Sequence, residues 1–146
     1  TSEEVAATIA FLASNGAGYI TSVCTGAFIL GAAGLLQGKK ATCHWAYTHL
    51  LPLFGAMHQP TRVVRDGNLI TAGGVTSGID FALELIAAIS GEDVARTIQL
   101  ALEYDPAPPF GGGSLAHSKE ETVRRLRADV YDQAAAEMEI AIKKII

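Results

Sequence analysis

The chain has 146 residues, 49% of them hydrophobic, so it can bury the core of one ordinary domain. Its 11 lysines and arginines face 15 aspartates and glutamates, which gives a net charge of −4 and no basic surface for nucleic acid. The longest nearly uncharged apolar stretch, residues 27–36, is too short to span a membrane, and no signal-peptide pattern opens the chain. Two cysteines make no disulfide framework, so we expect a protein of the reducing cytoplasm.

The first segments predict a helix followed by a strand, a turn and a second helix. Thr1 and Glu4 form a capping box, and apolar residues at helical spacing follow until residues 15–16 stop the helix. Residues 19–23 are β-rich and uncharged, which is typical of a strand covered on both faces. A helix is then expected over residues 25–33.

The middle of the chain predicts short strands and a hairpin. Residues 41–44 are typical of a short buried strand, and residues 45–54 of a short helix that Pro52 disturbs. Residues 61–64 and 68–72 are β-rich runs with an Asp-Gly pair between them. Because Asp-Gly is a strong turn signal, we expect a β-hairpin here.

Two neighbouring helices are expected next. Residues 79–89, with Thr76 or Ser77 as N-cap, are apolar nearly all round, which predicts a buried helix. A second helix is expected over residues 92–102, with an apolar face that includes Val94. The short break between them predicts that the two helices pack together.

The last part of the chain predicts a loop and then one long helix. Residues 105–114 hold three prolines and three glycines and cannot form a regular element. Ser118 and Glu121 then form a second capping box for a helix over residues 118–146. At 1.5 Å per residue this helix is roughly 40 Å long, so we expect part of it to meet a second subunit.

The alternation of strands and helices predicts an α/β fold with a mainly parallel sheet. Only two strands of that sheet are clear before the hairpin, whereas buried parallel strands need neighbours on both sides. We therefore expect preceding βα units that are missing from this chain, which would then be the C-terminal portion of a single domain over residues 1–146.

Cys24 is the strongest candidate for chemistry. The segment Ser22-Val23-Cys24-Thr25-Gly26 has the pattern of a nucleophile elbow, in which a sharp turn from strand to helix demands small residues two places before and after the nucleophile. The free N–H groups at the helix start favour the thiolate and can stabilise negative charge on a substrate. A small buried side chain is the alternative for Cys24, but its position favours catalysis.

The other cysteine and the histidines carry weaker signals. Cys43 lies inside a short apolar run and is best interpreted as core filler, and the expected compartment disfavours a disulfide with Cys24. His44 lies at a strand end, where the residue pattern alone fits a core histidine and a site residue equally well. The remaining histidines lack the spacing of metal ligands, so no metal site is expected: His49, His58 and His117.

Two further residue patterns have features of functional sites. Asp80 and Glu84 lie four residues apart on an apolar helix, which fits either a site-facing pair or a polar stripe, and the stripe is favoured because charged residues are rarely buried without partners. The glycines at 73–74 and 111–113 lack the strand and helix context of a nucleotide-binding loop. We therefore expect no nucleotide cofactor.

The sequence resembles the ThiJ/PfpI superfamily. The cysteine segment TSVCTGAF (21–28) and the following GLLQGKKATCHW (34–45) are similar to its cysteine elbow and next strand, and DGNLITAGG (66–74) with GIDFAL (78–83) is similar to a later segment. Within the superfamily the isocyanide hydratases are the most similar group, through QLALEYDPAPPF (99–110). The resemblance covers essentially the whole chain, but only the C-terminal two-thirds of the family.

This resemblance implies a flavodoxin-like sandwich with helices on both faces, a homodimer, and catalysis without metal or cofactor. It implies that Cys24 attacks the terminal carbon of an isocyanide and that water releases a formamide from the resulting thioimidate. Thr25 would supply a backbone N–H and its hydroxyl, and His44 matches a histidine found near the cysteine in relatives. The family's catalytic carboxylate comes from the first βα region, expected before Thr1, and nothing here matches it. Cys43 replaces the usual threonine, a departure of little expected consequence.

Two other functions stay open at this point. The same thiolate could serve another superfamily chemistry, such as glyoxal hydration or peptide hydrolysis. The cysteine segment is also similar to the sensor domains of AraC-type transcription regulators, which continue into a basic helix-turn-helix domain. The last helix here carries nearly balanced charge, so the regulator is the less favoured hypothesis.

Overall fold

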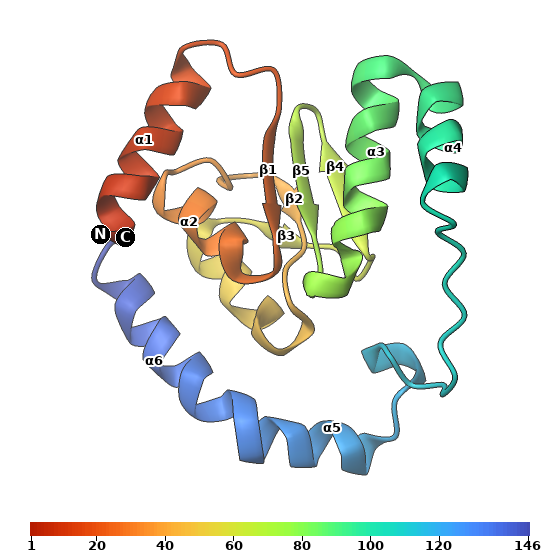
Figure 1. Cartoon of the computed structure of the whole chain (residues 1–146). Coiled ribbons are helices and arrows are strands. Elements are labelled where there is room, and N and C mark those ends of the chain that lie inside the picture. The colour runs from red at the N-terminus through yellow and green to blue at the C-terminus, as the bar shows by residue number, and fades with distance from the viewer.

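The computed structural model describes the backbone of residues 1–146 and every side chain except that of Ser2. A three-stranded sheet has the order β1-β5-β4, in which β1 (Ile20–Val23) pairs in parallel and β4 (Val63–Asp66) antiparallel with β5 (Leu69–Ala72). Helices lie on both sides of this sheet (Figure 1). The expected α/β class is confirmed.

The hairpin is confirmed, and it belongs to the main sheet. Asp66 pairs with Leu69 across a turn in which Gly67 has a φ of 67°, a left-handed conformation that suits glycine. All four residues of β5 are buried, because β1 and β4 flank them and helices cover the sheet. β5 is therefore the central strand.

The strand expected at residues 41–44 is shorter than predicted and lies elsewhere. β2 (Lys40–Ala41) pairs in parallel with β3 (Met57–His58) to form a second, two-stranded sheet. The next N–H, that of Thr42, donates to the hydroxyl of Thr71 on β5 at 2.9 Å. A side-chain bond thus replaces the strand ladder here, and the prediction of a longer strand in the main sheet was wrong.

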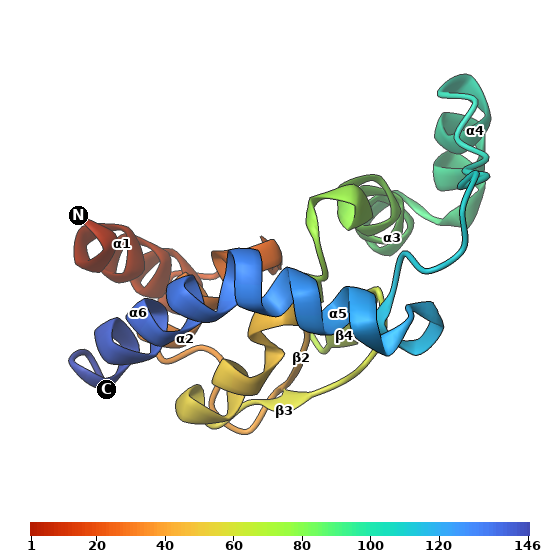
Figure 2. The same cartoon turned by 90° about the horizontal axis from the view of Figure 1, so that it is seen from below.

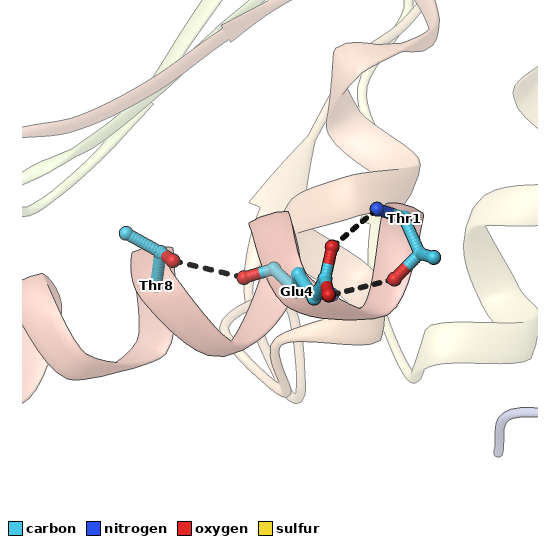
Figure 3. Close-up of polar contacts among 3 residues, drawn as sticks. All are labelled: Thr1, Glu4 and Thr8. Atoms are coloured by element: carbon cyan, nitrogen blue, oxygen red, sulfur yellow. Dashed lines mark hydrogen bonds and ion pairs between the residues drawn. The ribbon is translucent and has the colours of Figure 1, made fainter.

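The first helix, α1 (Ser2–Ser14), begins with the predicted capping box. The Thr1 hydroxyl accepts a hydrogen bond from the Glu4 N–H, and the Glu4 carboxylate reaches back to the Thr1 nitrogen, as Figure 3 shows. One turn later, the Thr8 hydroxyl donates to the Glu4 carbonyl at 2.9 Å. The helix ends at Asn15, as expected.

The core lies between α2 (Ala27–Ala32), the main sheet and the 3-10 helix η2 (Trp45–Phe54), which confirms the helix expected over residues 45–54. The last helix, α6 (Asp132–Lys143), closes this core through two buried residues. Burial of these apolar side chains is the main source of folding free energy. The larger core side chains are Leu30, Leu36, Tyr47, Leu50, Leu51, Phe54, Leu69 and Ile142.

The two helices after the hairpin are neighbours, but the first is not buried. α3 (Gly78–Ser90) follows the short 3-10 helix η3 (Val75–Ser77) and packs on β5 and on α4 (Glu92–Ala101). Every residue of α3 is half-buried or exposed, and Ile89 is 64% exposed. The prediction of a buried helix was wrong, since α4 and β5 cover only part of its circumference. Val94, on the expected apolar face of α4, is 43% exposed.

The C-terminal helical region contains a change of helix type. α5 (Glu120–Leu126) passes into the π-helix η5 (Arg127–Tyr131) and then into α6, and Figure 2 shows these segments running along the molecule. Residues 105–114 form the expected loop, followed by the short η4 (Leu115–His117).

The second predicted capping box does not form. Ser118 donates its hydroxyl to the carbonyls of Gly112 and Ser114, while Lys119 occupies the N-cap position without a side-chain cap. The loop contacts thus compete successfully for the Ser118 hydroxyl. Among the described residues, no helix is long and apolar enough to cross a membrane.

Gly31 offers a test of the core between α2 and η2. A Cβ atom at this position would clash with the ring of Phe54, which is buried and stacks on Phe28. Gly31→Ala gains about 1 kcal/mol of helix propensity but loses more to overpacking, so we expect a net loss of about 1–2 kcal/mol. Thermal unfolding of the variant should show a lower Tm.

A second substitution isolates the clash. In a background of Phe54→Leu, which removes ring atoms, Gly31→Ala should cost less than it does alone, as a double-mutant cycle would measure. An unchanged or higher Tm for Gly31→Ala alone would contradict the packing described here.

Candidate functional site

Cys24 lies at a sharp turn between β1 and α2. The residues Cys24–Gly26 form a single 3-10 turn, η1, and Cys24 itself has a φ of 61°. This left-handed conformation costs a non-glycine residue about 1–2 kcal/mol. A Cβ atom on Gly26 would lie 3.6 Å from the Cβ of Ser22, so the two small residues of the elbow do lie together.

The helical segment at Cys24 covers nearly the range expected, residues 25–33, but it starts in 3-10 rather than α-helical geometry. It begins as the 3-10 turn η1, and α2 then adds six residues.

Two backbone hydrogen bonds hold the strained turn. The Cys24 N–H donates to the Gly73 carbonyl at 2.7 Å, and the Gly73 N–H donates to the Arg62 carbonyl at 2.9 Å. The Ser77 N–H and hydroxyl both donate to the Gly74 carbonyl, which closes the loop between β5 and α3. A strained residue persists only where its surroundings fix it, and this loop supplies that restraint.

The two cysteines differ in environment. Cys24 is half-buried, whereas Cys43 is only 2% exposed, and both are free thiols. Burial, and secondarily the nearby Cys24, raises the pKa of the Cys43 thiol to about 12. Cys43 is therefore protonated at neutral pH and fills the core, as expected.

His44 has a structural role next to the site. It is the N-cap of η2, where its Nδ1 accepts a hydrogen bond from the Ala46 N–H at 3.3 Å. Nε2 consequently carries the proton of the neutral ring. Desolvation lowers the pKa of His44, which favours this neutral form. The ring edge with Cδ2 and Nε2 faces Gly74, the neighbour of the carbonyl that holds Cys24.

Two tyrosines that the sequence analysis missed lie beside His44. The rings of Tyr47 and Tyr131 are 5.5 and 5.2 Å from the His44 ring, centroid to centroid, and Trp45 completes this aromatic cluster. Burial raises the pKa of Tyr47, and the neighbouring Tyr131 and then Cys24 raise it further. Tyr131 ends the π-helix η5, a kind of segment that occurs frequently at functional sites.

The other candidate residues lie apart from this cluster. Asp80 forms an ion pair with Arg62 at 2.5 Å, while Glu84 is exposed, so the two carboxylates do not act as one site-facing pair. The three remaining histidines are exposed, and the described residues contain no group of three or more metal-ligating side chains. Thr25 is half-buried in η1, directly after Cys24.

A large apolar groove of about 600 Å³ lies between α1, α2 and α6. Its walls include Phe28, Met138 and Ile145, but neither Cys24 nor His44. The groove is thus separate from the candidate site, and the chemistry of its lining provides no nucleophile.

The strain at Cys24 can be measured by two substitutions. Both Cys24→Ala and Cys24→Gly remove the sulfur, but only glycine adopts a φ of 61° without penalty. The free energy of unfolding of Cys24→Gly, measured by urea denaturation, should be about 1 kcal/mol higher than that of Cys24→Ala. An alanine variant at least as stable as the glycine variant would argue against the strained turn.

His44 should make folding stability depend on pH. Its folded pKa lies below the ordinary value of 6.5, so below about pH 6.5 the unfolded state binds more protons and stability falls. Asparagine can cap η2 without titrating. His44→Asn should therefore lose less stability than the wild type between pH 7 and pH 5 in urea unfolding. The exposed His49→Asn is the control, and equal losses in all three proteins would refute the assignment.

Comparison with known proteins places these features in a family. A sequence model of the DJ-1/PfpI family matches residues 2–88. Isonitrile hydratase of Pseudomonas putida is 52% identical over 132 residues, covering 84% of this chain and 58% of that protein. The HTH-type transcriptional regulator GlxA of Rhizobium meliloti is 34% identical over 107 residues, covering 65% of this chain and 31% of the regulator.

A solved structure extends the agreement to three dimensions. The crystal structure of a ThiJ/PfpI family protein from Pseudomonas syringae matches with a TM-score of 0.77 at 45% identity, covering 92% of this chain and 59% of that one. The chain thus spans less than two thirds of the length of the isonitrile hydratase and of this structure. With the family match over residues 2–88 and the shared fold, the chain belongs to the DJ-1/PfpI family.

Proposed function

We propose that this site hydrates isocyanides to N-substituted formamides, with Cys24 as the nucleophile. The observation that carries the proposal is the 52% identity to isonitrile hydratase over 84% of the chain. The strained, half-buried Cys24 at a strand-to-helix turn supports it, since nucleophiles are commonly presented on such turns.

The proposed reaction needs two covalent steps. The Cys24 sulfur and a proton add to the terminal carbon of the isocyanide, which gives a thioimidate. Water then adds to the same carbon, the carbon–sulfur bond breaks, and the products are the formamide and the free thiol. One water molecule is consumed, and one difficult hydration is divided into two easier steps.

Thr25 and His44 are assigned supporting roles in this proposal. The Thr25 N–H and hydroxyl follow Cys24 directly and would stabilise negative charge that develops on the substrate. His44 has its Nε2–H edge on the Gly74 side of the site and would donate a hydrogen bond from Nε2–H to the reacting groups. Its lowered pKa keeps the ring neutral at pH 7, with Nε2 available as a donor.

A sensor function is the second candidate, because GlxA, named as a transcriptional regulator, matches 65% of the chain. Such a domain would bind a small molecule without turning it over. Steady-state turnover of an isocyanide by the full-length protein separates the two functions. Other DJ-1/PfpI chemistries, including glyoxal hydration and peptide hydrolysis, are tested by turnover assays with those substrates. The homodimer stays a prediction.

Cys24→Ala should abolish the hydration of an alkyl or aryl isocyanide, followed by chromatography of the formamide. The matched control is Cys43→Ala, which removes the other thiol but leaves the elbow intact. Because the buried Cys43 thiol has a pKa of about 12 and is not a nucleophile at neutral pH, its loss should leave kcat within about threefold. Undiminished turnover by folded Cys24→Ala would refute the proposed mechanism.

A further inference from the structure

An ion pair between Arg62 and Asp80 contacts the loop that restrains Cys24. Arg62 precedes β4, and its Nε donates to the Asp80 carboxylate in the first turn of α3 at 2.5 Å. The Nη2 of the same guanidinium donates to the Thr76 carbonyl at 2.5 Å. The planar guanidinium holds these two donor nitrogens at a fixed separation, whereas all the donors of a lysine ammonium are on one nitrogen.

The backbone of Arg62 holds the other end of the same loop. Its carbonyl accepts the Gly73 N–H at 2.9 Å, and the Gly73 carbonyl accepts the Cys24 N–H at 2.7 Å. Arg62 therefore bonds to the loop at Gly73 through its backbone and at Thr76 through its side chain. A continuous chain of contacts runs from Asp80 through Arg62 and Gly73 to Cys24.

Packing holds the Ser77 end of this loop, which is fully buried, but not its middle. Val75 is 79% exposed, and Thr76 is exposed as well. Because the middle of the loop is exposed, the hydrogen bonds of Arg62, together with the bonds of Ser77 to the Gly74 carbonyl, restrain the loop and with it the Gly73 carbonyl. If that carbonyl shifts, the left-handed Cys24 backbone can relax and the sulfur moves. A displacement of about 1 Å at a reacting atom can cost about 100-fold in rate.

We propose that Arg62 and Asp80 are positioning residues for Cys24: their ion pair fixes the loop 73–77, and the loop fixes the strained backbone of the nucleophile. The inference rests on the proposed function only in taking Cys24 as the nucleophile. Neither residue needs to touch the substrate. Their loss should therefore affect the reactivity of the sulfur more than the binding of substrate.

The test compares variants of the full-length protein in two assays. In Arg62→Met and Asp80→Asn, we expect kcat for isocyanide hydration to fall about tenfold, which corresponds to about 1.4 kcal/mol, with KM within about twofold. Alkylation of Cys24 by iodoacetamide, followed by mass spectrometry, should slow by a similar factor. Arg96→Met removes the surface ion pair with Glu92 on α4 and should change neither rate.

Two further variants guard against an effect on folding alone. Arg62→Lys keeps the charge but loses the two separate donor nitrogens, so its rates should lie between those of the wild type and Arg62→Met. If the ion pair acts as a unit, the double variant Arg62→Met/Asp80→Asn should be no more than about twofold slower than the slower single variant. Circular dichroism and Tm measurements establish that each variant is folded at the assay temperature. If Arg62→Met is unfolded, the rates of Asp80→Asn and Arg62→Lys decide the outcome.

The outcomes separate this inference from the proposed function. Folded Arg62 and Asp80 variants with wild-type alkylation and wild-type kcat would overturn the positioning role, even where Cys24→Ala abolishes hydration. Slower alkylation in these variants, combined with a wild-type protein that hydrates no isocyanide, would support the positioning role and refute the proposed function. A rise in KM with unchanged kcat and alkylation would also overturn the inference.

Discussion

The hydrogen bond from the Cys24 N–H to the Gly73 carbonyl is the contact on which the candidate site depends. It joins the end of β1 to the end of β5, two strands that pair in parallel, and it holds Cys24 at a φ of 61°. Parallel strands end at the same edge of a sheet, so the turns that follow them meet there. The site is therefore a consequence of the sheet: the strand pairing sets the distance between the two turns, and the turns set the backbone of the cysteine.

The sequence correctly predicted the elements that depend on contacts between residues close together in the chain. The capping box at Thr1, the hairpin and the elbow at residues 22–26 each depend on residues within a few positions of one another, and the structure has all three. The second capping box failed because the Ser118 hydroxyl finds the carbonyls of Gly112 and Ser114 instead. The residue types at 118 and 121 carry no information about that competing loop.

Contacts between distant segments explain what the sequence pattern missed. Tyr131 reaches His44 from the far end of the chain because the C-terminal helical region crosses the core, and the π-helix η5 that carries Tyr131 has no residue signature. The apolar pattern of residues 79–89 predicted burial. Such a pattern identifies side chains that can be buried, but not whether another element covers them. How much of α3 is covered depends on β5 and α4.

The contrast between the two thiols limits what can follow a covalent bond at Cys24. Cys43 lies close enough for the charge of Cys24 to raise its pKa, but burial contributes more and keeps Cys43 protonated at neutral pH. A protonated thiol is a poor nucleophile, so Cys43 is not suited to displace a group bound to Cys24. An adduct on Cys24 must then be released by water or by another molecule from solution. Hydrolysis of a thioimidate would be a release of this kind. Because Cys43 is buried and unreactive, such an adduct would stay intact until water reaches it.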